Sequence, residues 1–233
     1  MIYKSKILIN KNLITVIIIN SNYGTYLSKC VSSVLKNDLN CIKEILIIDD
    51  SSKDKSLRII KEIEKKSNKI ISYKVKFKNL SKSLNFAISK VKTEWILKID
   101  SDDYIDQNMI KFLYKYQTNY DFILGNTYLF DKEKIYKKKQ IIKTNFLKYF
   151  FHPLGSGNLF KKKLWNKIGG YNEANKFKDD VFFWTKILKI KNLKIKHLNK
   201  HLYFYRQHKK SMSKNIFRKY LALIKIIYKD LQS

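Results

Sequence analysis

Short apolar runs alternate with helical patterns through the first half of this chain. The runs 14–19, 45–48 and 95–99 are almost wholly apolar, which is typical of strands buried on both faces. Between them, apolar residues recur at helical spacing, for example over 26–35 and 80–91. This order predicts an α/β fold whose parallel strands are joined by crossover helices.

The second half is less regular. We expect a strand over 121–130, followed by a basic loop or hairpin end over 131–140. Residues 153–158 predict a glycine-containing loop that leads to a helix start, and 178–188 an amphipathic helix. From 213 to 230, apolar residues at helical spacing are interspersed with Lys and Arg, which predicts a C-terminal amphipathic helix.

The chain carries 49 Lys and Arg against 19 Asp and Glu, a net charge of +30. Such a charge favours polyanionic neighbours: nucleic acid, anionic lipid or a phosphate-bearing substrate. Lysine is spread along nearly the whole sequence, however, as the codon bias of an AT-rich genome would also produce. The charge therefore does not choose among these partners.

No stretch approaches 18 consecutive apolar residues, so the sequence predicts no transmembrane helix. The run Ile7–Ile9 is too short for the central region of a signal peptide, and we expect a cytoplasmic protein. Cys30 and Cys41 lack a metal-ligand spacing, which favours two reduced, buried thiols over a zinc site.

Acidic residues are scarce, yet nine of the 19 fall in three short clusters. The clusters are Asp49, Asp50 and Asp54; Asp100, Asp102, Asp103 and Asp106; and Asp179 with Asp180. The first two clusters follow predicted strands, and Asn20-Ser21-Asn22 follows a third strand. Ligands of open parallel sheets bind beyond the carboxyl ends of the strands, so the sequence predicts a binding site at that edge.

The second acidic cluster has two interpretations. Three carboxylates at the end of a buried strand are costly to hold together unless a cation shares them. Mg²⁺ or Mn²⁺ binds such oxygens and keeps coordination positions for substrate phosphates. Aspartates after a strand can instead form turns or cap helices. For the second cluster alone, a metal site and a turn or helix cap are equally supported. Capping is favoured for the first cluster, and for the third it is well supported because carboxylates at a helix start suit the helix dipole.

Eight short segments follow one another in a recognisable order. They are Thr15–Asn22, Ile47–Asp54, Leu84–Ile88, Ile99–Asp103, Gly157–Phe160, Ile168–Glu173, Asp179-Asp180 and Tyr205–Ser213. No single segment is specific. Together, over residues from about 13 to 213, they resemble the inverting nucleotide-sugar glycosyltransferases of family 2.

The resemblance implies the GT-A fold, a Rossmann-like three-layer α/β/α arrangement with a mostly parallel central sheet and a C-terminal helix. It implies a single catalytic domain over residues 1–233. Within it, about 13–105 would bind the nucleotide sugar, about 106–212 would bind the acceptor, and about 213–233 would form the amphipathic helix.

The resemblance also implies roles for residues that bind the donor. Asp50 would accept a hydrogen bond from the nucleotide base, and Asn20 and Asn22 would line the same pocket. Asn85 is a further residue expected to bind the donor.

A second set of roles concerns the metal and the proton transfer. Asp100 and Asp102 would bind the metal and the diphosphate, with Asp103 in support, and His208 would approach the same groups. Asp180 would be the general base that deprotonates the acceptor hydroxyl.

The chain departs from the family pattern at four positions. Ile19 stands where Pro or Thr is common, Ser21 where Tyr is common, and Leu84 where Arg is common. These three leave the selectivity for base and sugar open. Asp179 stands where Glu is more usual, and no required chemical group is lost.

The activity implied is metal-dependent transfer, with Mn²⁺ or Mg²⁺, of one sugar from a nucleotide diphosphate sugar to a hydroxyl of a glycan or lipid-linked acceptor. UDP is the expected nucleotide, and bacterial surface polysaccharide or lipopolysaccharide synthesis is the expected setting. The C-terminal helix would pack on the domain, with contact to an anionic membrane at the cytoplasmic face of the inner membrane as the alternative.

Two alternatives to this activity stay open. One is a basic nucleic-acid-binding protein, which requires basic and aromatic residues gathered on one face. Scattered lysine and three carboxylate clusters count against nucleic acid as a partner. The other is a glycosyltransferase-like fold without activity, although both the metal motif and the expected base are present.

Overall fold

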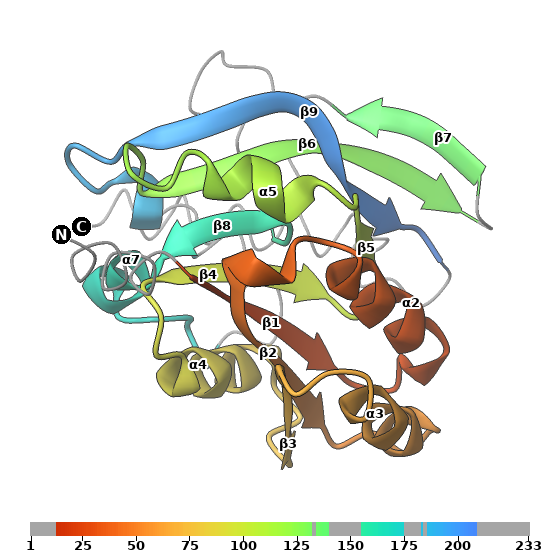
Figure 1. Ribbon diagram of the computed structural model, residues 1–233. Helices are drawn as coiled ribbons and strands as arrows, with labels where there is room; N and C mark the ends of the chain where they lie inside the picture. The colour runs from red at the N-terminus through yellow and green to blue at the C-terminus, as the bar shows by residue number, and fades with distance from the viewer. Residues whose placement is uncertain (1–12, 132–133, 140–154, 175–182, 184–185, 209–233) are drawn as a thin grey trace, which may run out of the picture.

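The computed structural model describes residues 13–131, 134–139, 155–174, 183 and 186–208. Over these residues, nine strands form one sheet and helices cover both of its faces (Figure 1). The four strands that the sequence indicates in the first half, including a half-buried one where Ile71, Tyr73, Val75 and Phe77 alternate with polar residues, are all present. They are β1 (Ile14–Asn20), β2 (Ile42–Asp50), β3 (Ile70–Val75) and β4 (Trp95–Asp100).

These four strands form the parallel half of the sheet, in the order β3-β2-β1-β4. Every residue of β1 is buried, as its uninterrupted apolar sequence predicts for a strand with neighbours on both sides and helices on both faces. The connections are α2 (Gly24–Leu35) with the short 3₁₀ helix η1 (Leu39–Cys41), then α3 (Ser56–Glu64) and α4 (Leu80–Lys90).

The other half of the sheet is mixed. Its elements are β5 (Tyr104–Ile105), α5 (Met109–Tyr114), β6 (Phe122–Asp131), β7 (Lys134–Lys139), β8 (Asn158–Lys161), α7 (Lys162–Ile168) and β9 (Ile195–Arg206). Strand β8 lies antiparallel between β4 and β6, whereas β9 runs parallel to β6 and antiparallel to β5. Strand β7 forms a hairpin with β6, so the segment expected as a basic loop or hairpin end over 131–140 carries a strand. The parallel arrangement expected from the sequence therefore describes the first half of the sheet, and the second half joins it through antiparallel pairs.

Two expectations for the second half need comment. The loop before Asn158 leads into strand β8, and the helix expected there starts four residues later as α7. The long strand β9 was not anticipated. The C-terminal helix over 213–230 and the pair Asp179-Asp180 lie outside the described residues, so they stay predictions.

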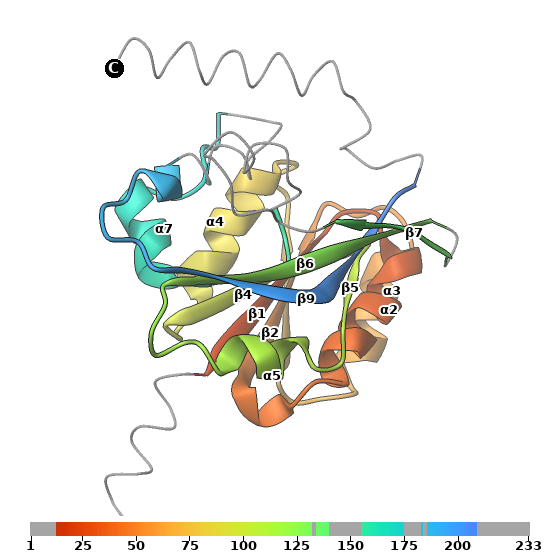
Figure 2. The ribbon, with the colours of Figure 1, turned by 90° about the horizontal axis from the view of Figure 1, so that it is seen from above.

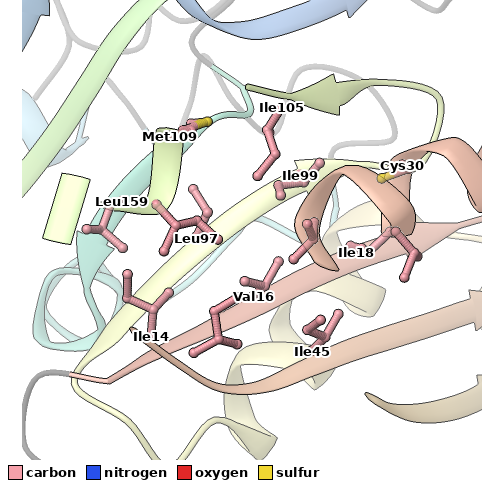
Figure 3. Packing of buried hydrophobic residues seen from close by; sticks show 14 of the residues in the cluster. Ile14, Val16, Ile18, Cys30, Ile45, Leu97, Ile99, Ile105, Met109 and Leu159 are labelled. Carbon is pink, nitrogen blue, oxygen red and sulfur yellow. The ribbon is translucent and has the colours of Figure 1, made fainter. Parts of the chain in front are cut away.

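The sheet is the middle of three layers. Helices α2, α3 and α5 cover one face, and α4 and α7 cover the other (Figure 2). Figure 3 shows the first face, where Val16 and Ile18 of β1 and Leu97 of β4 pack with Cys30 of α2 and Met109 of α5. Alternate residues of the same strands enter the second core, which includes α4 and α7.

Both cysteines agree with the sequence analysis. Cys30 and Cys41 are buried free thiols. None of the helices within the described residues has the length and apolar character needed to cross a membrane.

The turn before β8 makes a prediction about stability. Gly157 has φ +75°, and a Cβ added there would lie 2.5 Å from Cδ2 of Tyr203. Gly169 has nearly the same φ, +74°, but no atom lies within 4 Å of an added Cβ. We expect Gly169→Ala to cost about 1 kcal/mol through backbone strain alone, and Gly157→Ala about 3 kcal/mol through strain plus overlap. Urea denaturation of both variants measures the difference, and equal losses would contradict the placement of Tyr203.

Candidate active site

The carboxyl ends of β1 and β2 meet through Asn20 and Asp49, which are register partners. Asn20 is fully buried, and its Nδ2 donates to Oδ2 of Asp49 at 2.8 Å and to Oγ of Ser52 at 3.2 Å. Its Oδ1 is buried as well and accepts no hydrogen bond from the described residues. Since buried acceptors are nearly always paired, this oxygen is suited to a donor that comes from outside the chain.

Asp50 holds the loop between β3 and α4. Its carboxylate accepts hydrogen bonds from the backbone amides of Lys78 at 2.8 Å and Asn79 at 3.0 Å, and from Oγ of Ser83 at 2.9 Å. Burial raises the pKa of this carboxyl, but the amide and hydroxyl donors outweigh it, so the pKa lies below its usual range. Asp50 is therefore an ionised anchor whose oxygens are engaged by the chain.

Asn22 shapes the neighbouring turn. It has φ +61°, its Oδ1 accepts from the amide of Lys53 at 2.7 Å, and its own amide donates to Oγ of Ser52 at 2.8 Å. Asp54 accepts from the amides of Ser56 and Gly24, at the first residues of α3 and α2. Asp54 thus satisfies free amides at two helix starts, as the turn or capping interpretation expects, although Lys55 and Tyr23 are the N-cap residues.

The second cluster lies on the other side of β1, at the end of β4. Asp100 is the register partner of Ile19. Its side chain is 35% exposed, more than that of Asp102 or Asp103. Its Oδ1 accepts from Nζ of Lys98 at 2.9 Å. Lys98 was not among the residues expected at the site, although it is a lone lysine inside the apolar run 95–99.

Asp102 is paired with the C-terminal end of the described chain. Its Oδ2 lies 2.9 Å from Nε2 of His208, and both side chains are largely buried. Burial and the nearby charge of Asp100 raise the pKa of the Asp102 carboxyl, and the contact with His208 opposes that rise only in part. The structure therefore brings Asp100, Asp102 and His208 together, as the sequence predicts.

Asp103 is buried and secures β9. It accepts from the hydroxyl of Tyr203 at 2.6 Å and from the backbone amide of Arg206 at 2.7 Å. Burial, followed by the charges of Asp102 and Asp100, raises the pKa of Asp103 well above its usual range, against the effect of these donors. Nε of Arg206 also donates to the carbonyl of Asp102 at 2.8 Å.

Aromatic rings of α2 and the preceding residue border the second cluster. The ring centroids of Tyr23 and Tyr26 lie 5.5 and 5.3 Å from that of His208. The guanidinium carbon of Arg206 lies 4.5 Å from the centroid of Tyr26, a cation–π distance. Burial and then the charges of Asp102 and Asp100 raise the pKa of Tyr23 to about 12, so its hydroxyl stays protonated at neutral pH.

Asn85 lies elsewhere, on α4, where it contacts α7 and the turn after it. Its Oδ1 accepts from Nε1 of Trp165 and the amide of Tyr171, and its Nδ2 donates to the carbonyl of Tyr171 and to Oε1 of Glu173. Gly170 is required beside it, because a Cβ there would lie 2.9 Å from Oδ1 of Asn85. The side chain of Asn85 thus joins α4 to the turn after α7. Its expected contact with the sugar-donor substrate stays a prediction.

A divalent ion fits this edge only with help from a substrate. Within the described part of the chain, no group of three His, Cys, Asp or Glu side chains is arranged to hold a metal. Asp100 and Asp102 offer two carboxylates from the same turn at the end of β4. Mg²⁺ and Mn²⁺ sites of this kind commonly combine one or two carboxylates with phosphate oxygens. Asp180, the expected base, lies outside the described residues.

Residues 15–221 match the family model described as glycosyl transferase family 2. The chain belongs to this family. A relative in Staphylococcus aureus, poly(ribitol-phosphate) beta-N-acetylglucosaminyltransferase TarP, is 28% identical over 242 residues, covering 93% of this chain and 71% of TarP. Glycosyltransferase GlyA of Streptococcus pneumoniae is 29% identical over 222 residues, but this chain, 86% of which is aligned, spans only 31% of GlyA.

Solved structures show that this member of glycosyl transferase family 2 has the GT-A fold. The structure of S. aureus TarS 1-349 in complex with UDP-GlcNAc superposes with a TM-score of 0.72 at 21% identity, covering 87% of this chain and 61% of that one. A mannosyltransferase from Pyrobaculum calidifontis, in complex with GDP-Man and Mn²⁺, gives 0.71 at 14% identity, with 94% and 64% covered.

The anchoring role of Asp50 predicts a pH-dependent loss of stability. Asp50→Asn places an NH₂ group against amide donors, and we expect it to lower the free energy of unfolding by about 2–3 kcal/mol at pH 7. Because the folded pKa lies below the unfolded value, this stabilisation is present above about pH 4 and is lost as pH falls through the folded pKa.

Urea denaturation across this pH range tests the prediction. The gap between wild type and Asp50→Asn should narrow on acidification. Asp38→Asn is the control, because Asp38 is exposed and Asn can still cap η1. A gap that is absent at pH 7, or independent of pH, would show that Asp50 does not act as an ionised anchor.

Proposed function

We propose that this protein is an inverting glycosyltransferase that moves one sugar from a UDP-sugar to a hydroxyl of a glycan or lipid-linked acceptor. The setting would be the synthesis of a bacterial cell-surface polysaccharide or lipopolysaccharide. The observation that carries the proposal is that two sets of polar side chains meet at the carboxyl ends of neighbouring parallel strands. Asn20 lies at the end of β1, and Asp100 and Asp102 lie at the end of β4 beside it.

The two groups divide the donor between them. The buried, unpaired Oδ1 of Asn20 supports a base pocket between β1 and β2, where the base offers an N–H donor. The oxygens of Asp100 and Asp102 support the diphosphate side, through Mn²⁺ or Mg²⁺. When bound, the ion would neutralise negative charge on the departing nucleoside diphosphate. Tyr23, protonated at neutral pH, adds a hydroxyl donor beside these oxygens.

The chain's own groups then handle orientation and the proton. His208 holds Oδ2 of Asp102 in place, and Asp103 fixes the end of β9, from which His208 projects. Asp180 would accept the proton of the acceptor hydroxyl as that oxygen attacks the anomeric carbon from the side opposite the diphosphate. A carboxylate is a weak base, so its contribution lies in position as much as in basicity.

The comparisons support the substrate classes proposed. TarP is named as a transferase of N-acetylglucosamine to poly(ribitol-phosphate), a polymer, and the TarS structure contains UDP-GlcNAc. A solved neighbour holds Mn²⁺ together with its nucleotide sugar. These statements concern those proteins. For this chain, TarP and TarS support a UDP-sugar donor and a polymeric acceptor, whereas the neighbour with Mn²⁺ carries GDP-Man.

Ligand-induced stabilisation tests the donor site. We expect UDP with Mn²⁺ to raise the melting temperature of the wild type, because a ligand that binds only the folded state stabilises it. Asp102→Asn, or EDTA in place of Mn²⁺, should abolish the increase. Asp38→Asn should retain the increase in melting temperature. Asp38 caps η1, which leads into the first residue of β2, so it lies at the amino end of the parallel strands. An increase that survives in Asp102→Asn would remove Asp102 from the donor site.

The general base gives a separate prediction. We expect Asp180→Asn to lower kcat for sugar transfer by about 10²–10⁴-fold while UDP binding in the presence of Mn²⁺ is unchanged. UDP release from a UDP-sugar in the presence of acceptor measures kcat. Asp179→Asn is the matched control and should stay within about tenfold of wild type. Equal losses in the two variants, or loss of UDP binding in Asp180→Asn, would argue against a base at position 180.

A further inference from the structure

Lys98 is a charged residue inside an apolar layer. It lies in β4 two residues before Asp100, with Ile17 of β1 as its register partner on one side and Asn158 of β8 on the other. Only 6% of the residue is exposed. Ile96, on the same face of the strand, belongs to the hydrophobic core under α4. A lysine in such a place must have partners, since an unpaired buried charge is strongly unfavourable.

The ammonium group of Lys98 uses all three of its donors. Nζ donates to Oδ1 of Asp100 at 2.9 Å, to the carbonyl of Gly155 at 2.6 Å and to Oγ of Ser156 at 2.8 Å. One bond therefore goes to the candidate metal site, and two go to the turn that precedes β8. A single fixed charge joins these two parts of the molecule.

The turn is held from the backbone as well. The amide of Gly157 donates to the carbonyl of Lys98 at 2.8 Å. The ring of Tyr203 lies directly against Gly157, and its hydroxyl donates to Asp103 and accepts from the amide of Asp100. The turn over 155–157 is thus packed between Lys98 and the strand that carries Arg206 toward the site.

Lys98 also makes the carboxylates of Asp100 and Asp102 unequal. Asp100 has one oxygen engaged by an ammonium group, whereas Oδ2 of Asp102 contacts an imidazole. A divalent ion at this edge would meet Asp100 with part of its charge already balanced. Like charges repel at short range inside a protein, so the ammonium opposes the binding of the ion.

We propose that Lys98 is a positioning residue that competes with the divalent ion for Asp100 and fixes the 155–157 turn beside it. This inference rests on the proposed function and deepens it. The ammonium weakens binding of the ion while it keeps Asp100 and the turn in one arrangement. Removal of the ammonium should then move two properties in opposite directions: tighter binding of the ion and slower sugar transfer.

The test compares Lys98→Met with wild type. Met has nearly the length of the lysine side chain but no charge and no donor. Calorimetric titration of UDP at a series of Mn²⁺ concentrations gives the Mn²⁺ concentration for half-maximal UDP binding. We expect this concentration to fall at least threefold in Lys98→Met, while kcat, from UDP release, falls at least tenfold. Lys92→Met, at an exposed lysine, is the control and should match wild type in both.

Two further variants separate the two effects. Ser156→Ala removes one bond to the turn and leaves the charge, so it should lower kcat without a change in the Mn²⁺ requirement. Lys98→Gln removes the charge and keeps a donor, and it should again lower the Mn²⁺ requirement. Lys98→Gln also replaces Lys98→Met in the test if the methionine variant does not fold.

The outcomes are distinguishable. An unchanged or higher Mn²⁺ requirement in both Lys98 variants, with wild type binding UDP in a Mn²⁺-dependent way, would overturn the role of Lys98 alone. A loss of thermal stability without the shift in Mn²⁺ requirement would show that Lys98 is only structural. Failure of the wild type to bind UDP with Mn²⁺ would overturn the proposed function and this inference together.

Discussion

Buried charge must be paired, and this requirement governs the end of β4. Three carboxylates lie within four residues there, and each has a different partner: an ammonium for Asp100, an imidazole for Asp102, and a phenol with a backbone amide for Asp103. These partners come from β4 and from the C-terminal part of the described chain. The pairing therefore fixes the second half of the molecule against the first, in addition to shaping a site.

Hydrogen-bond partners also separate polar side chains that are engaged within the chain from those that keep an oxygen for a ligand. Asp50 and Asp103 are engaged by donors within the chain, and Asn85 joins α4 to the turn after α7. Asn20 keeps a buried acceptor without a donor among the described residues, and Asp100 stays partly exposed at the sheet edge. Asn20 and Asp100 end the neighbouring parallel strands β1 and β4, and the register that pairs Ile19 with Asp100 places them side by side.

The sequence predicted the parallel half of the sheet because its strands are continuous apolar runs bounded by polar residues. It also predicted that Asp102 and His208 meet, through the order of family motifs, although 106 positions separate them. It did not predict β8, which has only four residues, or β9, whose twelve residues mix polar and apolar side chains without a clear period. Lys98 was missed although a lysine inside a buried apolar run is unusual, because the sequence does not show which groups pair with it; the structure shows three partners.

A crystal structure with UDP and Mn²⁺, with diffraction data collected at the manganese absorption edge, tests most directly whether this edge holds a nucleotide diphosphate. We expect an anomalous peak in contact with Asp102 or Asp100 and with the diphosphate, and the uracil on the side of Asn20. A nucleotide bound at another face of the sheet, or manganese at this edge with no contact to either aspartate, would contradict the proposed donor site.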